Sequence, residues 1–279
     1  MGEFEKKHIN ELIKKGYSII QDVFSKDEAK KYCVDSNKIK ILENKKISDG
    51  TRDLDADYKA YKFSGTHVYN PTRQYRNYDK LISSSSVIKI LEKLFGTNPI
   101  LSQTELRNTE KNEIDDKAFL WHRDGRVMTN DPLWILAIYI FNDIGNFSGP
   151  TEVREYSHNP MLVGYDKQKI KLPKKFSRKQ LTVKSGDVIL MNANILHRAT
   201  KKLSDDDRWI LVATYSPWYM KPSMDPTKAF STDEFHKLDE TQKALFGFTS
   251  IVPSDERKRV YTVVPWEEII NEIDFRKND

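Results

Sequence analysis

The sequence predicts a mainly β fold with flanking helices, built around a β-sandwich or jelly roll. Short strand-like segments fill the middle of the chain, and turn residues such as Gly149-Pro150 and Gly186-Asp187 separate them. After a first strand over 17–23, the expected strands cover residues 100–106, 119–122, 134–141, 182–183, 188–191 and 209–215. Several short strands at this spacing are typical of sandwiches and jelly rolls.

Helical patterns flank these strands on both sides. Apolar side chains recur at helical spacing over residues 4–15, where Gly16 is well placed to end the helix, and a further helix is expected over 85–95. A serine followed three residues later by a glutamate is a capping-box pattern. This pattern predicts two more helix starts, at Ser25 with Glu28 and at Ser231 with Glu234, the latter helix reaching Leu245.

The chain is expected to form one domain over residues 1–279. A single domain is expected because no internal repeat or long linker is visible. Within it we distinguish a helical N-terminal flank (1–98), a β core (99–218) and a mixed C-terminal extension (219–279). Hydrophobic residues make up 38% of the 279 residues and charged residues 31%, which is the balance of a globular protein with a well-solvated surface.

Composition argues against several classes of protein. The longest apolar run, 133–141, is too short to cross a bilayer, and the N-terminus lacks the apolar stretch of a secretory signal. Cys33 is the only cysteine, so an intrachain disulfide and a cysteine-based metal cluster are excluded, and a cytoplasmic location is expected. The net charge of +5 is mild, whereas nucleic-acid binding calls for a denser basic stripe.

Two side chains that can bind a metal occur together in Trp121-His122-Arg123-Asp124. If residues 119–124 are extended, His122 and Asp124 lie two positions apart and point to the same face, where both can reach one metal ion. Alone, this spacing also suits an ordinary polar pair at the end of a strand.

A second histidine strengthens the case for a metal site. Gly186-Asp187 forms a turn, an apolar strand follows it, and His197 lies just past that strand. Two histidines and one carboxylate are the ligands of non-haem iron(II) oxygenases and leave positions open for a cosubstrate and oxygen. Zinc remains an alternative, although a closed structural zinc site needs a fourth ligand. Of the other histidines, His158 is expected to order a loop. His8, His67 and His236 look like surface or helix residues and indicate no function.

Arg208 is the candidate anchor for a dicarboxylate. If the chain forms a hairpin about residues 202 and 203, Arg208 lies opposite His197. A guanidinium beside an iron site can pair bidentately with the far carboxylate of 2-oxoglutarate. The alternative is a surface arginine that pairs with Asp205 to Asp207.

Taken in order, these motifs resemble the phytanoyl-CoA dioxygenase family. The resemblance rests on His122-x-Asp124, on Ser148-Gly149-Pro150-Thr151 leading to Ser157-His158, and on Gly186-Asp187, His197 and Arg208. The opening segment 15–28 and the closing segment 238–247 also look like those of the family. The resemblance implies a double-stranded β-helix core, of the jelly-roll or cupin type. It further implies Fe(II), 2-oxoglutarate and O2 as cofactor and cosubstrates, with succinate and carbon dioxide as coproducts.

The sequence departs from the family at the distal histidine. Many members carry a small hydroxyl residue two positions after it, where this chain has Ala199, and Thr200 is the candidate replacement. The strand before the His-x-Asp motif often supplies inward polar side chains. Gln103 and Arg107 match those positions loosely, so Arg107 is a candidate contact of the cosubstrate and Gln103 of the substrate. An ordinary strand surface is the alternative for both.

The expected reaction is hydroxylation of a small organic or acyl-type substrate. The same ligands also serve desaturation, epimerisation and ring closure, and a non-catalytic cupin-like binding protein is the alternative from another class. The basic residues between 167 and 179 are expected to form either a solvated loop or a rim that attracts an anionic substrate. Neither a nucleic acid nor a membrane is an expected partner, and the sequence leaves the oligomeric state open.

Overall fold

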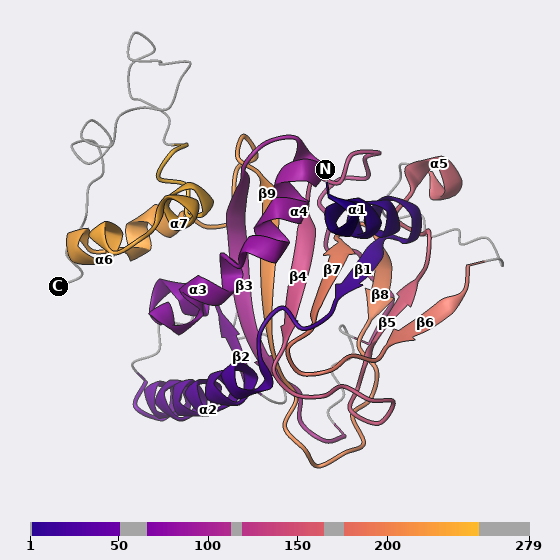
Figure 1. The fold of residues 1–279 in the computed structure, drawn as a ribbon. Helices are drawn as coiled ribbons and strands as arrows, with labels where there is room; N and C mark the ends of the chain where they lie inside the picture. The colour runs from indigo at the N-terminus through magenta and orange to yellow at the C-terminus, as the bar shows by residue number, and fades with distance from the viewer. Residues whose placement is uncertain (1, 51–65, 113–118, 165–175, 251–279) are drawn as a thin grey trace, which may run out of the picture.

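Two antiparallel sheets form the centre of the protein. The computed structural model describes residues 2–50, 66–112, 119–164 and 176–250 (Figure 1). The larger sheet has six strands in the order β1 (Tyr17–Ile20), β7 (Val188–Asn192), β4 (Ile135–Ile140), β9 (Trp209–Pro217), β3 (Pro99–Asn108) and β2 (Thr66–Tyr69). The smaller sheet has the order β6 (Arg178–Leu181), β5 (Thr151–Arg154) and β8 (Leu196–Arg198).

An apolar layer joins the two sheets. Ile138 and Val212 of the larger sheet belong to the same buried cluster as Val153 and Leu181 of the smaller one. These side chains alternate with residues that face the opposite side of each strand, which is the periodicity that a two-sheet core requires. The arrangement confirms the predicted jelly roll, although the two sheets do not close into a barrel.

Helices cover the other face of the larger sheet. They are α1 (Glu3–Lys15), α2 (Lys26–Ser48), α3 (Asp79–Ile82) and α4 (Ser85–Phe95). In Figure 1, α4 runs across β9 and β4, and its buried residues Ile90 and Leu91 share a cluster with Tyr139 and Tyr215 of these strands. Burying a side chain of this size contributes about 1.5–3 kcal/mol, so this layer holds the sheet rigid behind the site.

The helix boundaries follow the capping signals in the sequence. Gly16 ends α1 with a φ of 92°, a conformation that favours glycine. Before α2, the Ser25 hydroxyl accepts from the Glu28 amide at 3.1 Å, and the Glu28 carboxylate accepts from the Ser25 amide at 2.9 Å. These contacts, together with the observed bounds of α1 and α4, confirm the predicted N-terminal helices.

The C-terminal helical segment differs from the prediction. Instead of one helix from Ser231 to Leu245, the structure has α6 (Thr232–His236) and α7 (Glu240–Leu245). Asp239 causes the break, because its carboxylate accepts from the Gln242 amide at 2.8 Å and caps a new helix. The remaining short elements are α5 (Pro160–Val163) and the 3-10 segments η2 (Pro71–Arg73), η3 (Arg76–Tyr78) and η4 (Pro226–Ala229).

Two expected strands are reduced to single bridges, and four strands were not predicted. Residue 122 forms only an isolated bridge with residue 197, so the prediction of a strand over 119–122 was wrong. Similarly, Val183 pairs only with Ile144. The unpredicted strands β2, β5 and β6 are short and largely polar, and β8 is a separate strand that contains His197. β1 confirms the strand expected over 17–23, although it ends at Ile20, and β2 is an unpredicted second strand in the N-terminal flank.

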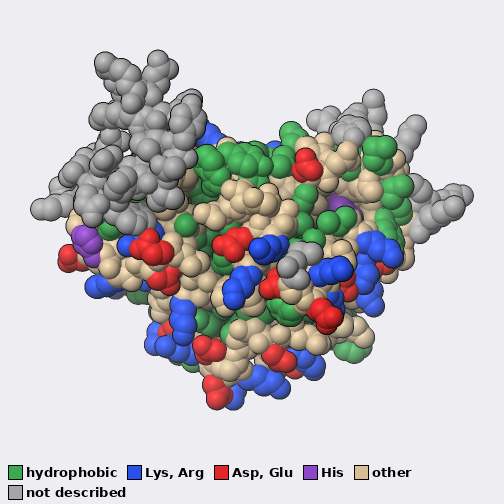
Figure 2. Space-filling model, turned by 45° about the horizontal axis from the view of Figure 1, so that its top comes forward, with side chains coloured by type: hydrophobic (Ala, Val, Ile, Leu, Met, Phe, Trp, Pro, Cys, Tyr) green, Lys and Arg blue, Asp and Glu red, His purple; other side chains and the backbone are tan. Residues whose placement is uncertain are grey.

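The described surface carries mixed charge. On the face shown in Figure 2, Lys and Arg side chains are interspersed with Asp and Glu. The basic stretch 167–179 lies outside the described residues except for its last four positions. Within the part of the chain that the structure describes, no helix has both the length and the apolar character to cross a membrane.

Candidate active site

The structure brings His122, Asp124 and His197 together. The two histidines are backbone partners: the His122 amide donates to the His197 carbonyl at 3.0 Å, and the His197 amide donates back at 3.1 Å. Directly opposite residues of an antiparallel pair present their side chains on one face. The two imidazole rings accordingly lie 4.2 Å apart between their centroids, although the histidines come from distant parts of the sequence.

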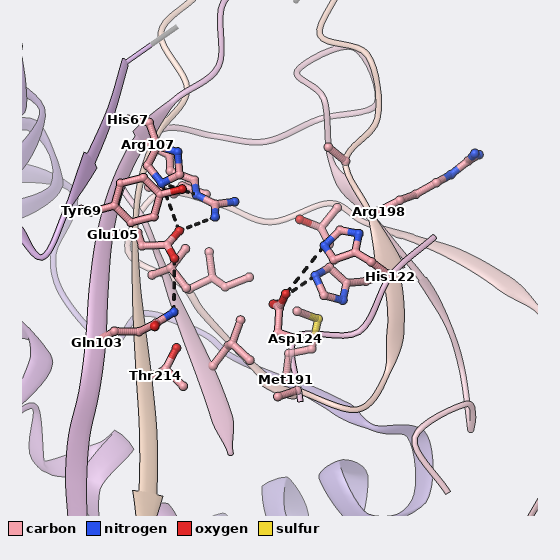
Figure 3. Close-up of a pocket in the computed structure, with 18 of the residues that line it drawn as sticks. His67, Tyr69, Gln103, Glu105, Arg107, His122, Asp124, Met191, Arg198 and Thr214 are labelled. Atoms are coloured by element: carbon pink, nitrogen blue, oxygen red, sulfur yellow. Dashed lines mark hydrogen bonds and ion pairs between the residues drawn. The ribbon is translucent and has the colours of Figure 1, made fainter. Parts of the chain in front are cut away.

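Both imidazoles are oriented for metal binding through Nε2. His122 Nδ1 lies 2.8 Å from the Leu120 carbonyl, and His197 Nδ1 lies 3.2 Å from the Ile195 carbonyl. A carbonyl can only accept, so each Nδ1 carries the proton and each Nε2 keeps its lone pair. The Nε2 atoms lie 3.8 Å and 3.4 Å from the Asp124 carboxylate, as the dashed lines in Figure 3 show.

This donor set fits a divalent metal ion. One ligand atom from each of the three residues lies within 4.8 Å of the others. Enclosure opposes ionisation of the Asp124 carboxyl, but His197, His122 and Arg107 hold its pKa well below the usual range. Burial, together with His197, lowers the pKa of His122, whereas the Asp124 carboxylate outweighs burial and raises the pKa of His197 in the absence of a metal. A carboxylate and a neutral imidazole are the protonation states that a metal requires.

The segment around the ligands is closely held. The guanidinium groups of Arg154 and Arg198 lie over the Trp121 ring at 4.9 and 4.8 Å from its centroid. These cation–π contacts fix the residue immediately before His122. On the other side of the motif, the Gly125 amide donates to the Ala193 carbonyl at 2.8 Å. A Cβ atom on Gly125 would overlap the Asn194 side chain, so any larger residue there requires Asn194 to move.

A pocket of about 570 Å³ opens beside the three ligands. Its floor is apolar and comes from the larger sheet, with Leu136, Ile138, Met191, Ile210 and Val212. A polar wall formed by β2 and β3 of the same sheet, with His67, Tyr69, Gln103, Glu105 and Arg107, faces the three candidate ligands across the pocket (Figure 3). An apolar cavity with a few placed polar groups is the usual form of a small-molecule site.

Arg208 lines this pocket, but it does not lie opposite His197. The predicted hairpin was wrong, because β8 pairs with β5 whereas β9 pairs with β3 and β4. The Arg208 amide donates to the Asn108 side chain at 2.9 Å, and Nη1 donates to the Thr109 hydroxyl at 3.2 Å. Arg208 is only 6% exposed, which argues against a surface arginine paired with nearby aspartates.

Gln103 and Arg107 share the pocket wall with a carboxylate that the sequence interpretation missed. Arg107 forms an ion pair with Glu105, and Gln103 donates to the same carboxylate at 3.3 Å. Burial opposes ionisation of Glu105, yet Arg107 and His67 lower its pKa to about 2. Glu105 is therefore a permanent negative charge that orients Arg107.

Two further residues differ from expectation. His67, for which the sequence indicated no function, lies in the pocket wall with Nε2 3.1 Å from the Glu105 carboxylate. The hydroxyl of Thr200 donates to the Pro150 carbonyl at 2.6 Å, so it does not replace the hydroxyl that Ala199 lacks. The expectation for His158 holds, because its ring contacts the Ile13 carbonyl at 3.0 Å and ties a loop to α1.

The fold and the site define a class of protein. A jelly roll whose pocket holds two histidines and one carboxylate is the arrangement of non-haem iron(II) oxygenases. The chain belongs to the phytanoyl-CoA dioxygenase family, whose model matches residues 12–210. It is therefore an oxidoreductase of the iron(II)- and 2-oxoglutarate-dependent class.

Solved structures of such oxygenases share the fold at low sequence identity. EctD from S. alaskensis with bound Fe is 17% identical, with a TM-score of 0.61 over 80% of this chain and 80% of that one. HygX from Streptomyces hygroscopicus, with nickel, 2-oxoglutarate and hygromycin B bound, is 15% identical, with a TM-score of 0.57 over 78% and 89%.

The epimerase SnoN from nogalamycin biosynthesis is likewise 15% identical, with a TM-score of 0.57 over 76% of this chain and 83% of that one. A comparison with curated protein sequences gives no significant match.

Proposed function

We propose that His122, Asp124 and His197 hold the iron of this oxygenase and that the adjoining pocket binds a small organic molecule for oxidation. The observation that carries the proposal is the convergence of both Nε2 atoms on the Asp124 carboxylate. Zinc in a closed structural site is disfavoured, because the described residues offer no fourth ligand in this group.

We assign the cosubstrate to the end of the pocket near Arg208. Its buried guanidinium can form two parallel hydrogen bonds with the far carboxylate of 2-oxoglutarate. Arg107 lies on the neighbouring strand, since its partner across the pair β3–β9 is Ile210. We propose that Arg107, held by Glu105, contacts the same cosubstrate and limits its freedom in the pocket.

The protein residues supply binding, orientation and protection. Bound iron with 2-oxoglutarate and oxygen supplies the oxidation of an unactivated C–H bond, with succinate and carbon dioxide as coproducts. The Leu120 and Ile195 carbonyls accept from each Nδ1 and so direct each Nε2 towards the metal position, and the apolar floor excludes water from the site.

We propose hydroxylation as the outcome, with Gln103 among the substrate contacts. The cavity of about 570 Å³ is of the size that takes a small molecule. The similar structures include the epimerase SnoN and the carbocyclase SnoK, so the same fold also serves these outcomes. A cytoplasmic location stays a prediction that rests on the cysteine count.

Oxygen consumption tests the proposal. We expect the purified chain with Fe(II) and 2-oxoglutarate to consume oxygen and form succinate, slowly without substrate. His197→Ala should abolish succinate formation while circular dichroism stays unchanged. His236→Ala is the matched control, because this histidine is exposed on α6. A fully active His197→Ala variant would remove the metal assignment, and a parent chain that consumes no oxygen would favour a non-catalytic binding protein.

A further inference from the structure

The charges that line the pocket are unevenly balanced. Four arginines contribute to its lining: Arg107, Arg126, Arg198 and Arg208. Arg107 is neutralised by Glu105. Arg198 forms an ion pair with Glu152 at 2.6 Å, and its side chain points away from the cavity in Figure 3. With Arg208 assigned to the cosubstrate, Arg126 remains without a defined role.

Arg126 has one hydrogen bond and no carboxylate partner among the described residues. Its Nη2 donates to the Ser223 hydroxyl at 2.7 Å. Nε and Nη1 make no hydrogen bond to any residue that the structure describes, and the side chain is exposed. An arginine with two open donor groups at the edge of a pocket can bind an anionic ligand without first breaking an ion pair.

Ser223 gives this arginine a fixed position. The Ser223 amide donates to the Ser102 hydroxyl at 3.0 Å, and the two hydroxyl groups lie 3.2 Å apart. Ser102 is only 1% exposed and lies at the irregularity in β3 between Leu101 and Gln103. The Arg126 guanidinium therefore bridges the metal-binding segment and the chain that follows β9.

This group lies at the opposite end of the pocket from the proposed cosubstrate site. Arg208 is bonded to Asn108, whereas Arg126 is connected through Ser223 to Ser102. Six residues of strand separate these anchor points on β3, a distance of about 20 Å along the backbone. Gln103 and Thr214 line the wall between them and face each other across β3 and β9.

We propose that the primary substrate carries an anionic group, a carboxylate or a phosphate or sulfate ester, and that Arg126 and Ser223 bind this group. The inference rests on the proposed function, because it gives Arg208 to the cosubstrate. The apolar floor then receives the hydrocarbon part of the substrate, and Gln103 and Thr214 bind neutral polar groups between the anion and the metal.

Simple six-carbon probes test the proposal in the full chain. The protein is loaded with Ni(II) and saturating 2-oxoglutarate without oxygen, so that Arg208 is occupied. Dissociation constants for hexanoate, hexyl phosphate, hexyl sulfate and neutral hexanamide are then measured by ligand-observed NMR. We expect at least one anion to bind about tenfold more tightly than hexanamide, and the difference among the three anions identifies the preferred group.

Variants locate the binding group. Arg126→Gln should remove the preference for the anion and leave hexanamide and 2-oxoglutarate binding unchanged, and Arg126→Lys should retain part of it. Arg73→Gln is the matched control, because Arg73 is an exposed arginine outside the pocket.

The inference is overturned if no anion binds at millimolar concentration, if hexanamide binds equally well, or if Arg126→Gln keeps the preference. Loss of 2-oxoglutarate binding in the parent would instead count against the proposed function.

Discussion

Replacing Glu105 with glutamine tests how the pocket wall is stabilised. The carboxylate is 8% exposed and contacts Arg107, His67 and Gln103. Burial opposes its ionisation, but Arg107 and His67 lower the pKa from 4.5 to about 2. This difference of about 2.5 pKa units corresponds to about 3 kcal/mol of folding free energy at 1.36 kcal/mol per unit.

The sign of the pH dependence follows from the direction of the shift. A carboxyl whose pKa is lower in the folded state contributes its full stabilisation above pH 4.5 and loses it as the pH falls towards 2. Glu105→Gln should therefore lower the free energy of unfolding by about 3 kcal/mol at pH 7. The difference in unfolding free energy between parent and variant should narrow by roughly 1 kcal/mol at pH 3.5.

Urea denaturation of the metal-free protein at both pH values measures this difference. Glu110→Gln is the matched control, because Glu110 forms an ion pair with Lys40 at 3.6 Å while 55% exposed. Its effect should stay below about 1 kcal/mol at either pH. The stabilising role of the Glu105 carboxylate would be refuted if parent and Glu105→Gln had the same free energy of unfolding at pH 7, or if their difference were the same at pH 3.5 as at pH 7.

Three further changes probe the site. Arg208→Ala should weaken anaerobic 2-oxoglutarate binding to the nickel protein at least a hundredfold, because an unpaired buried carboxylate costs about 3–5 kcal/mol, and Arg208→Lys should weaken it less. If calorimetry finds parental affinity in Arg208→Ala, Arg208 does not bind the cosubstrate. Trp121→Leu removes both cation–π contacts and should lower metal affinity about tenfold, because mutating residues that support the ligands of a metal site typically has an effect of this size. An unchanged affinity in a metal competition assay would contradict this. Gly125→Ala forces Asn194 to move and should also reduce metal affinity. Gly145→Ala should leave metal affinity unchanged, because the new methyl group meets open space. Equal metal affinities in the two variants would count against the tight packing at Gly125.

The three candidate metal ligands, which the structure brings together, could be identified because their signals are local. His122 and Asp124 are two residues apart, and His197 follows a turn and an apolar strand. The ends of α1 and α4 were equally visible, since a glycine directly after an apolar helical pattern is a local stop signal. Strand and turn spacing predicted a β-sandwich or jelly roll, and the family resemblance implied the jelly roll.

The surroundings of Arg208 depend on long-range pairing, which the sequence does not encode locally. The predicted hairpin assumed that β8 and β9 pair because they follow each other in the chain, as consecutive strands often do. In this jelly roll they belong to different sheets. Arg208 therefore reaches the pocket from the larger sheet, beside Asn108, instead of across from His197.

The polar wall was only partly foreseen. Gln103 and Arg107 were identified by alternation, and the same rule places Glu105 between them on one face of β3. His67 could not be found in this way, because its position depends on the pairing of β2 with β3 across a gap of more than thirty residues. A histidine in an unrecognised edge strand carries no local signal of the carboxylate that it will contact.

If His122, Asp124 and His197 hold the iron as proposed, the reciprocal backbone pairing of the two histidines also limits when the metal can bind during biosynthesis. A chain that has been synthesised only as far as β4 contains His122 and Asp124 but lacks the third ligand. Closing so long a loop is entropically costly and happens only when the flanking strands pair. On this assignment the complete donor set exists only once His122 has paired with His197, so we expect the folded chain to acquire the metal.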